Sequence, residues 1–395
     1  MIRPIKRRFK GPNGQEDMPY LLTPGPLTTS RAVKLAMLAD WGSWDSELKF
    51  IVAETRRRLL RLAGCDESYT CVLMQGSGSF GIEAALGSFA PIGRKKLLMI
   101  TNGAYGDRAV KMLQRLNRPH YILNYGDSQK PAAGEVDRLL VEDPMMSAVF
   151  MVHCETTSGI VNPLHDIAAA VKKRNRLLIL DAMSSFGAIP IDMAELGVDV
   201  MISSANKCIE GVPGFYYVLC RRDMLKDSKN HCHSLSLDLF EQWDHMEKTG
   251  QFRYTPPTHT LVAFYQALKE HEKEGGIAGR LARYMKNRDT LLAGMKRLGF
   301  HTLLAPEDAG PIIQTFLTPR DRKFDFQRFY DALKLRGFVI YPGKLTRRPS
   351  FRIGNIGQID AEVMQALVEA VRETLREMGV RDMTPDAEED ERRAS

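Results

Sequence analysis

Three features of this sequence could carry chemistry together: a glycine-rich turn, a carboxylate that ends an apolar run, and a lysine just beyond another apolar run. The turn is Gly76-Ser77-Gly78-Ser79-Phe80-Gly81, and a helix-like segment follows it. Asp181 ends the apolar run 177–181, and Lys207 follows the run 198–203. A glycine-rich turn that bears hydroxyl groups and opens a helix is typical of a phosphate-binding site.

The turn also satisfies the pattern G-x-G-x-x-G, so an NAD-dependent dehydrogenase is an alternative interpretation. That interpretation requires an acidic residue about 20 residues later, at the end of the next strand, to bind the ribose. The next predicted strand ends instead in Thr101-Asn102-Gly103. A further alternative is that the turn needs glycine for its backbone alone.

The carboxyl edge of a parallel sheet would bring Asp181 and Lys207 together, because open α/β sheets bind their ligands at that edge. Apolar runs that alternate with amphipathic segments such as Leu164–Arg174 predict such a sheet, and with it the α/β fold class. The predicted strands are 70–75, 96–101, 148–153, 177–181, 198–203 and 215–219.

A phosphate-binding turn, a lysine and an aspartate together fit pyridoxal 5′-phosphate. The lysine would bond to the cofactor aldehyde. The aspartate would hold the pyridine nitrogen protonated, because an opposite charge at close range raises the pKa of that nitrogen. A single lysine is most often an exposed surface residue, so it is the combination that predicts the cofactor.

The length of 395 residues suggests more than one domain. We expect a basic N-terminal arm over residues 1–19, a large cofactor-binding domain over 20–270, a smaller α+β domain over 271–378 and a charged tail over 379–395. In the smaller domain the predicted helices are 279–298, 325–336 and 361–378, and the predicted strands are 312–317, 339–341 and 350–353.

The composition, with 44% hydrophobic and 26% charged residues, is ordinary for a globular protein. The six cysteines show no C-x-x-C spacing, so we expect free thiols in a reducing compartment, the cytoplasm. Neither a membrane span nor a secretory signal is expected. The net charge of +7 leaves a nucleic-acid-binding protein open, although much of the excess lies in the first ten residues. The adjacent side chains of His231-Cys232-His233 do not predict a metal site.

Several longer segments carry a family resemblance. They are 22–29 (LTPGPLTT), 102–108 (NGAYGDR), 152–159 (VHCETTSG), 181–187 (DAMSSFG), 206–214 (NKCIEGVPG), 234–238 (SLSLD), 253–259 (RYTPPTH) and 351–357 (FRIGNIG). These segments resemble the 2-aminoethylphosphonate–pyruvate aminotransferase family of the class V aminotransferases. The resemblance implies the aspartate-aminotransferase-like fold, fold type I, with a mostly parallel sheet of the seven-stranded type. It also implies a homodimer whose active sites lie at the subunit interface.

The resemblance assigns roles to residues of the cofactor site. Lys207 is similar to the lysine that forms a Schiff base with pyridoxal 5′-phosphate, and Asp181 to the partner of the pyridine nitrogen. Ser77, Gly78 and Ser79 are similar to the phosphate cradle. Many relatives have threonine at the position of Ser79, and either residue supplies a hydroxyl group.

Further roles are implied around this centre. Tyr105 resembles the aromatic residue that stacks on the cofactor ring, and Thr157 is expected near the ring hydroxyl or the substrate. Thr255 resembles a residue that reaches the cofactor phosphate from the neighbouring subunit. Arg352 resembles the residue that binds the substrate anion, because a guanidinium can hold a carboxylate or phosphonate through two parallel hydrogen bonds.

The implied reaction is the reversible transfer of an amino group from 2-aminoethylphosphonate to pyruvate, which yields phosphonoacetaldehyde and L-alanine in phosphonate degradation. Alternatives within the same fold are a serine–glyoxylate or alanine–glyoxylate aminotransferase and a lyase that acts on a hydroxylated aminophosphonate. The expected partners are small-molecule substrates and a second copy of the chain. No nucleic acid, membrane or metal is expected.

Overall fold

A computed structural model describes residues 18–343 and 346–386 of the chain. These residues divide into two compact units. One unit contains residues 29–280, and the other contains residues 18–28 together with 281–386. Most of the predicted arm over residues 1–19, and the last part of the predicted tail over 379–395, lie outside the described residues.

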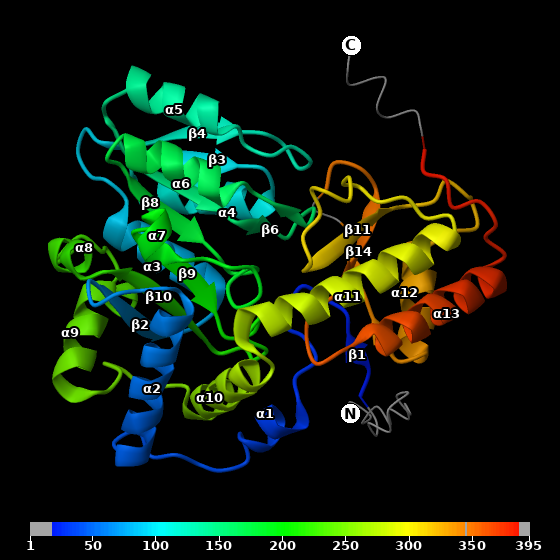
Figure 1. The fold of residues 1–395 in the computed structure, drawn as a ribbon, viewed down its shortest axis with the longest axis horizontal. Helices are drawn as coiled ribbons and strands as arrows, with labels where there is room; N and C mark the ends of the chain where they lie inside the picture. Colours follow the sequence, from blue (N-terminus) through cyan, green and yellow to red (C-terminus); the bar gives the residue numbers. More distant parts are fainter. Residues whose placement is uncertain (1–17, 344–345, 387–395) are drawn as a thin grey trace. The chain divides into compact units, whose positions relative to one another are not determined.

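The larger unit is built on one seven-stranded sheet (Figure 1). In order across the sheet, the strands are β2 (Tyr69–Gln75), β10 (Phe215–Arg221), β9 (Val200–Ser204), β8 (Leu177–Asp181), β5 (Met146–Val152), β3 (Lys96–Thr101) and β4 (His120–Asn124). β10 runs antiparallel to both of its neighbours, and the other neighbouring strands are parallel. The predicted α/β class with a mostly parallel sheet is confirmed.

Helices cover both faces of this sheet, and each face has its own hydrophobic cluster. One cluster takes residues from α2 (Ser46–Leu62), α5 (Ala133–Glu142), α6 (Leu164–Lys173) and α10 (Thr258–Lys273). The other takes residues from α3 (Gly78–Phe89), α4 (Ala104–Arg115), α8 (Arg222–Asp227) and α9 (Leu239–Thr249).

Burial on both faces explains why these strands are continuous apolar runs. In β2, Cys71 and Leu73 belong to one cluster, whereas Val72 and Met74 belong to the other. A strand covered on both sides needs apolar residues at successive positions rather than at alternate ones. The edge strand β4 is different, because Tyr121 and most of its neighbours are exposed or half-buried. The sequence pattern therefore did not predict β4.

The remaining elements of the larger unit are short. They are α1 (Arg31–Leu35), α7 (Met193–Leu196), the antiparallel pair β6 (Cys154–Glu155) and β7 (Ile160–Val161), and a 3₁₀ helix over Leu235–Leu237.

The smaller unit has a three-stranded antiparallel sheet in the order β11 (Ile313–Leu317), β14 (Ser350–Gly354) and β13 (Tyr341–Pro342). A parallel pair joins β1 (Tyr20–Leu21) to β12 (Phe338–Val339). Its helices are α12 (Phe326–Leu335), α13 (Ala361–Met378) and the part of α11 (Gly276–Arg297) that follows Arg280.

The smaller unit differs in three details from the sequence-based expectation. Residues 271–280, which we expected in the smaller domain, belong to the larger unit. Residues 20–28, which we expected in the large domain, group with this unit because β1 pairs with β12. The predicted strand 339–341 is divided between β12 and β13, which belong to different sheets.

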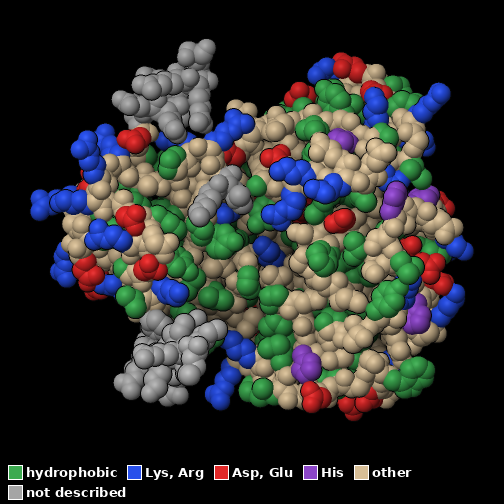
Figure 2. Space-filling view, turned by 180° about the vertical axis from the view of Figure 1, so that it is seen from behind, with side chains coloured by type: hydrophobic (Ala, Val, Ile, Leu, Met, Phe, Trp, Pro, Cys, Tyr) green, Lys and Arg blue, Asp and Glu red, His purple; other side chains and the backbone are tan. Residues whose placement is uncertain are grey.

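The surface carries charges of both signs. On the face shown in Figure 2, Lys and Arg side chains are interspersed with Asp and Glu side chains. All six cysteines are free thiols, as predicted. Among the described helices, none combines the length and the apolar character needed to cross a membrane.

Candidate active site

The carboxyl ends of β2, β8 and β9 lie at one edge of the large sheet and bring predicted residues together. β2 is followed by the turn at Gly76, whose φ of +121° favours glycine, and then by Ser77 at the start of α3. β8 ends at Asp181, and Lys207 follows β9 in a turn. The structure therefore places the turn, the aspartate and the lysine at the edge that the sequence predicted.

The N-terminus of α3 has the features of an anion site. Ser77 is the N-cap residue, and its side chain makes no capping hydrogen bond. The amide groups at the start of a helix lack partners within the helix, and the helix dipole favours a negative charge there. Ser77 is exposed, and Gly78 and Ser79 are half-buried, so a ligand can approach this turn.

The space next to Gly78 is occupied by the side chain of Met183, which follows β8. A Cβ atom at Gly78 would lie 2.6 Å from Sδ of Met183, which is closer than such atoms approach in proteins. Met183 also donates its amide hydrogen to Oδ1 of Asp181 at 2.9 Å. The glycine turn and the aspartate are thus held together through one residue.

Asp181 is a carboxyl group with little access to solvent, since only 5% of the residue is exposed. Burial raises the pKa of Asp181 to about 7, and the nearby charge of Glu155 acts in the same direction. The amide of Met183 and the positive charges of Lys207 and Arg108 oppose this increase in the pKa. A cation placed next to this carboxyl would favour its ionised form.

A second buried carboxylate organises the start of α4. Glu155 accepts hydrogen bonds from the hydroxyl of Thr157 at 2.6 Å, from the amide of Thr157 at 3.1 Å and from the amide of Gly106 at 3.2 Å. The hydroxyl of Thr157 in turn accepts from the amide of Ala104 at 2.9 Å. Glu155 therefore fills the N-terminus of α4, whereas no side chain caps α3.

The predicted stacking residue Tyr105 lies in the first turn of α4. Its ring is half-buried, and the guanidinium carbon of Arg108 lies 4.9 Å from the ring centre. Arg108 also donates a hydrogen bond to Oγ of Ser79 at 3.1 Å. Arg108 thus connects the aromatic residue of α4 with the glycine turn of α3.

Arg352 lies on β14 of the smaller unit and is 1% exposed. Its Nε and Nη2 both donate to the carbonyl oxygen of Pro342, at 3.1 and 2.9 Å. The guanidinium also lies over the ring of Tyr341, 4.9 Å from the ring centre. These contacts fix the plane of the guanidinium.

Thr255 differs from the other predicted residues. It is exposed in the segment between α9 and α10, and within the described residues its side chain makes no hydrogen bond. The structure of the single chain therefore leaves its assignment to the cofactor phosphate as a prediction.

Comparison with known proteins places the chain in a family. A model of the family "Aminotransferase class-V" matches residues 40–359. The chain belongs to the class V aminotransferases. Similar curated members include the 2-aminoethylphosphonate–pyruvate transaminase of Rhizobium meliloti (strain 1021), which is 54% identical over 93% of this chain and 96% of its own length. The protein of that name from Pseudomonas aeruginosa (strain PAO1) is 48% identical over 92% of this chain and 98% of its own length.

Solved structures show the same fold at lower identity. The pyridoxamine–pyruvate aminotransferase of Mesorhizobium loti has a TM-score of 0.83 and 20% identity, and covers 92% of this chain and 94% of its own. An alanine–glyoxylate aminotransferase from Nostoc sp. has a TM-score of 0.83 and 21% identity, and covers 91% of this chain and 96% of its own. Fold type I, predicted for this class V aminotransferase, is confirmed.

Two residues of this class V aminotransferase site were not assigned a role from the sequence. Glu155 and Arg108 both lie inside segments that resemble the family, 152–159 and 102–108. The signal for Glu155 is its place just after a buried apolar strand. Burial of a carboxylate costs free energy unless the group accepts hydrogen bonds. Arg108 follows Tyr105 by three residues, a spacing that places both on one helix face.

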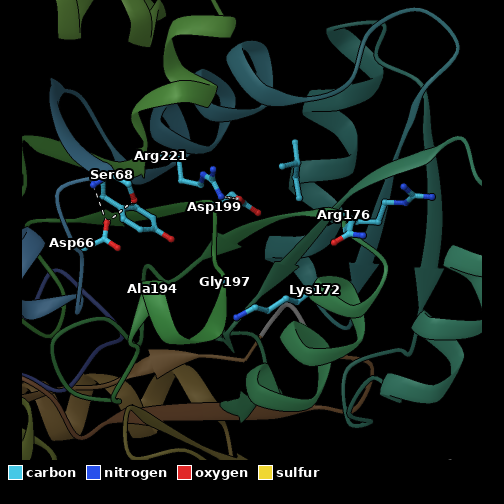
Figure 3. A pocket seen from close by; sticks show the side chains of 11 residues that line it. Asp66, Ser68, Lys172, Arg176, Ala194, Gly197, Asp199 and Arg221 are labelled. Atoms are coloured by element: carbon cyan, nitrogen blue, oxygen red, sulfur yellow. Dashed lines mark hydrogen bonds and ion pairs between the residues drawn. The ribbon is translucent and has the colours of Figure 1, made fainter.

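The larger unit of the aminotransferase has a hollow of about 420 Å³ at the edge of the sheet opposite to the predicted site residues (Figure 3). Lys172, Asp199 and Arg221 line it near the first residues of β8 and β9 and the last residue of β10. Arg221 pairs with Asp199 and with Asp223, so its charge is already balanced. None of the predicted site residues lines this hollow.

Proposed function

We propose that this aminotransferase transfers the amino group of 2-aminoethylphosphonate to pyruvate, with pyridoxal 5′-phosphate as its cofactor. The products would be phosphonoacetaldehyde and L-alanine, in the degradation of phosphonates. Relatives that are 46–54% identical over most of the chain carry the corresponding name. The structural observation that supports the proposal is the meeting of an uncapped helix N-terminus, Asp181 and Lys207 at one sheet edge.

The residues present fit the proposed cofactor. The start of α3 offers amide groups and the hydroxyls of Ser77 and Ser79 to a phosphate, and between them lies Gly78, where a Cβ atom would meet the end of the Met183 side chain. Asp181 is a buried carboxyl whose pKa is raised by burial, and a protonated ring nitrogen beside it would favour its ionised form. Tyr105 supplies an aromatic face at the start of α4.

When bound, pyridoxal phosphate supplies an electron sink for the negative charge that develops on the substrate carbon. Asp181 would hold the ring nitrogen in its protonated form. Lys207 Nζ would hold the cofactor before the substrate binds, and would then move a proton from the carbon that carries the substrate amine. Ser77, Gly78 and Ser79 would bind the phosphate and so fix the cofactor.

Arg352 would bind the anionic end of both substrates. The phosphonate of the amino donor and the carboxylate of pyruvate both present oxygen atoms to a guanidinium, which can donate two parallel hydrogen bonds. The carbonyl of Pro342 and the ring of Tyr341 orient this guanidinium before the substrate arrives. One arginine would then serve both halves of the reaction.

We further propose that the protein acts as a homodimer in the cytoplasm. Thr255, which is exposed in the single chain, would complete the phosphate site of the neighbouring subunit. A reducing compartment agrees with the free thiols of all six cysteines.

Two measurements on the purified protein test the proposed function. A panel of amino donors and keto acceptors should show the highest kcat/KM with 2-aminoethylphosphonate and pyruvate. Reduction with borohydride should then fix the cofactor mass on the peptide that contains Lys207, and Lys207→Ala should abolish this label. As a control, Lys172→Ala, at the opposite sheet edge, should keep the label. Preference for glyoxylate over pyruvate, or a label on another lysine, would contradict the proposal.

A further inference from the structure

The turn that carries Lys207 is fixed by hydrogen bonds from the residues that follow the lysine. The amide of Glu210 donates to the carbonyl of Lys207 at 2.8 Å, and the amide of Gly211 donates to the carbonyl of Ala205 at 2.9 Å. These bonds close a tight turn directly after β9. The direction in which Lys207 leaves the backbone therefore depends on the conformation of the residues that follow it.

Glu210 adopts an unusual backbone conformation in this turn. Its φ is +64°, in the left-handed region that residues with a side chain disfavour and glycine favours. The residue is also buried, with 3% of its surface exposed. A buried carboxylate in a disfavoured conformation persists only where its surroundings hold it there.

Arg280 provides the contact that holds this turn. Its Nη1 donates to the carbonyl of Cys208, the residue after Lys207, and lies 3.4 Å from Oε1 of Glu210. Its Nε donates to the carboxylate of Glu274 at 2.7 Å. Arg280 is 1% exposed and Glu210 is 3% exposed, so the contact between them lies away from water, whereas Glu274 is partly exposed.

A buried ion pair is a poor source of stability, because both charges lose their hydration. Its main effect is geometric, since the planar guanidinium donates in fixed directions and thereby defines where its acceptors lie. Here one acceptor is the main-chain carbonyl of Cys208, the residue after Lys207. Another is the side chain of Glu210, whose backbone in the same turn is strained. The pair therefore acts on the backbone of the lysine turn.

We propose that Arg280 and Glu210 are positioning residues that fix the direction of Lys207 toward the cofactor aldehyde. The inference rests on the proposed function of Lys207. It predicts a selective defect: the bond to Lys207 should form slowly in variants of the pair, although the rest of the cofactor site stays intact.

Two forms of the cofactor separate these effects. Pyridoxamine 5′-phosphate has an amine in place of the aldehyde, so it occupies the site without bonding to Lys207. Pyridoxal 5′-phosphate must also react with Lys207, which is followed by the change in visible absorption. The experiment starts from the full-length protein without cofactor. It measures the dissociation constant of pyridoxamine 5′-phosphate and the rate at which pyridoxal 5′-phosphate forms its covalent bond to Lys207.

Glu210→Gln keeps the size of the side chain and removes its charge, and Arg280→Lys keeps a charge and removes the planar fork. Because small displacements of reacting groups are costly, each should slow bonding to Lys207 by about tenfold to a hundredfold. Each should leave the dissociation constant of pyridoxamine 5′-phosphate unchanged. The matched control is Arg288→Lys, on the same helix, where the arginine donates to the carbonyl of Ala309; it should change neither quantity.

The possible results are distinct. Unchanged bonding rates in both variants would overturn the inference, and so would weaker binding of both cofactor forms together with a lower thermal midpoint, which a general structural role predicts. If Arg280→Lys fails to fold, the milder Glu210→Gln decides the question alone. Failure of the unaltered protein to bind either cofactor form would instead overturn the proposed function.

Discussion

Asp181 and Gly78 are linked through Met183, whose amide donates to Oδ1 of Asp181 at 2.9 Å. The sulfur atom of Met183 occupies the space that a side chain at residue 78 would need. The carboxyl group proposed to face the cofactor ring and the turn proposed to hold its phosphate therefore share one support. A substitution at residue 78 should therefore change the surroundings of Asp181, and a substitution at Asp181 should change those of Gly78.

Replacement of Asp181 by asparagine should change how the stability of the cofactor-free protein depends on pH. Burial raises the pKa of Asp181 to about 7 in the folded state, against about 3.9 in an unfolded chain. A raised pKa in the folded state gives stability that is fully present below the unfolded pKa and is lost as the pH rises through the folded pKa. The native protein should therefore lose up to about 4 kcal/mol between about pH 4 and pH 8 from this group.

Asp181→Asn removes this titration, so the thermal midpoint of the cofactor-free variant should fall less steeply with pH. Glu155, whose pKa burial also raises, should leave a residual slope in the same direction. At about pH 8 the variant should be the more stable protein, yet its turnover with cofactor should be much lower, because asparagine cannot hold the ring nitrogen protonated. Identical pH profiles for the two cofactor-free proteins would contradict the burial of an ionisable group at this position.

The sequence predicted the position of Asp181 and Lys207 well because Asp181 ends one buried strand and Lys207 follows another. Runs of apolar residues reveal such strands, and the carboxyl ends of parallel strands share one edge. The predicted run 177–181 coincides with β8 for this reason. By contrast, β4 was missed, since an exposed edge strand such as His120–Asn124 needs no apolar run.

Gly78→Ala should weaken binding of the cofactor phosphate through a steric effect. The new methyl group would meet Sδ of Met183 at 2.6 Å, so the flexible end of the methionine side chain must move. Overpacking costs about 1–3 kcal/mol, and the flexibility of methionine places this substitution at the lower end of that range. We expect a corresponding rise in the dissociation constant of the cofactor, measured by quenching of protein fluorescence.

The double variant Gly78→Ala with Met183→Ala tests the cause. Removal of the methionine side chain should recover most of the lost affinity, because the space for the methyl group is restored. Gly134→Ala is a matched control, since it also lies in the first turn of a helix and a Cβ there meets nothing within 4 Å. If the double variant binds no better than the single one, the turn itself requires glycine and Met183 is not the reason.

Arg352→Lys should impair both halves of the reaction. Lysine cannot keep the two hydrogen bonds that Nε and Nη2 make to the Pro342 carbonyl and also present a planar donor pair to an anion. Loss of a hydrogen bond to a charged group predicts a fall of about tenfold to a hundredfold in kcat/KM. Each half-reaction is measured in a single turnover with one substrate. Arg328→Lys, an exposed position on α12, should have no effect, whereas a defect in one half-reaction alone would mean that the two anions bind at different residues.

Interactions that hold the site together were less predictable than the residues proposed to face the cofactor. Thr157 was expected near the ring hydroxyl or the substrate, and the structure shows its hydroxyl between Glu155 and the amide of Ala104. Partners of this kind come from separate elements, here β6 and α4, that are brought together only by the fold. Spacing along the chain carries no information about such contacts, which is why Glu155 received no role from the sequence.

The last prediction concerns the exposed residue Thr255. If it completes the phosphate site of a neighbouring subunit, each active site contains Lys207 from one chain and Thr255 from the other. Homodimers of Lys207→Ala should then be inactive, and homodimers of Thr255→Glu nearly so, because the added carboxylate repels the phosphate. In a mixed dimer, one site receives both substitutions, whereas the other receives an intact lysine and an intact threonine.

Unfolding the two variants together and refolding them should therefore restore activity, up to one working site in each mixed dimer. If Thr255 instead serves its own chain, every site in the mixture carries one substitution and no activity returns. Native mass spectrometry counts the mixed dimers, so that a negative result is not confused with failed exchange. A mixture of Lys207→Ala with Asp181→Asn is the control, because both residues lie at the ends of strands of one sheet in the same chain. Every site of that mixed dimer therefore still carries one of the two substitutions. Activity in that control, or its absence in the Thr255 mixture despite mixed dimers, would contradict the shared site.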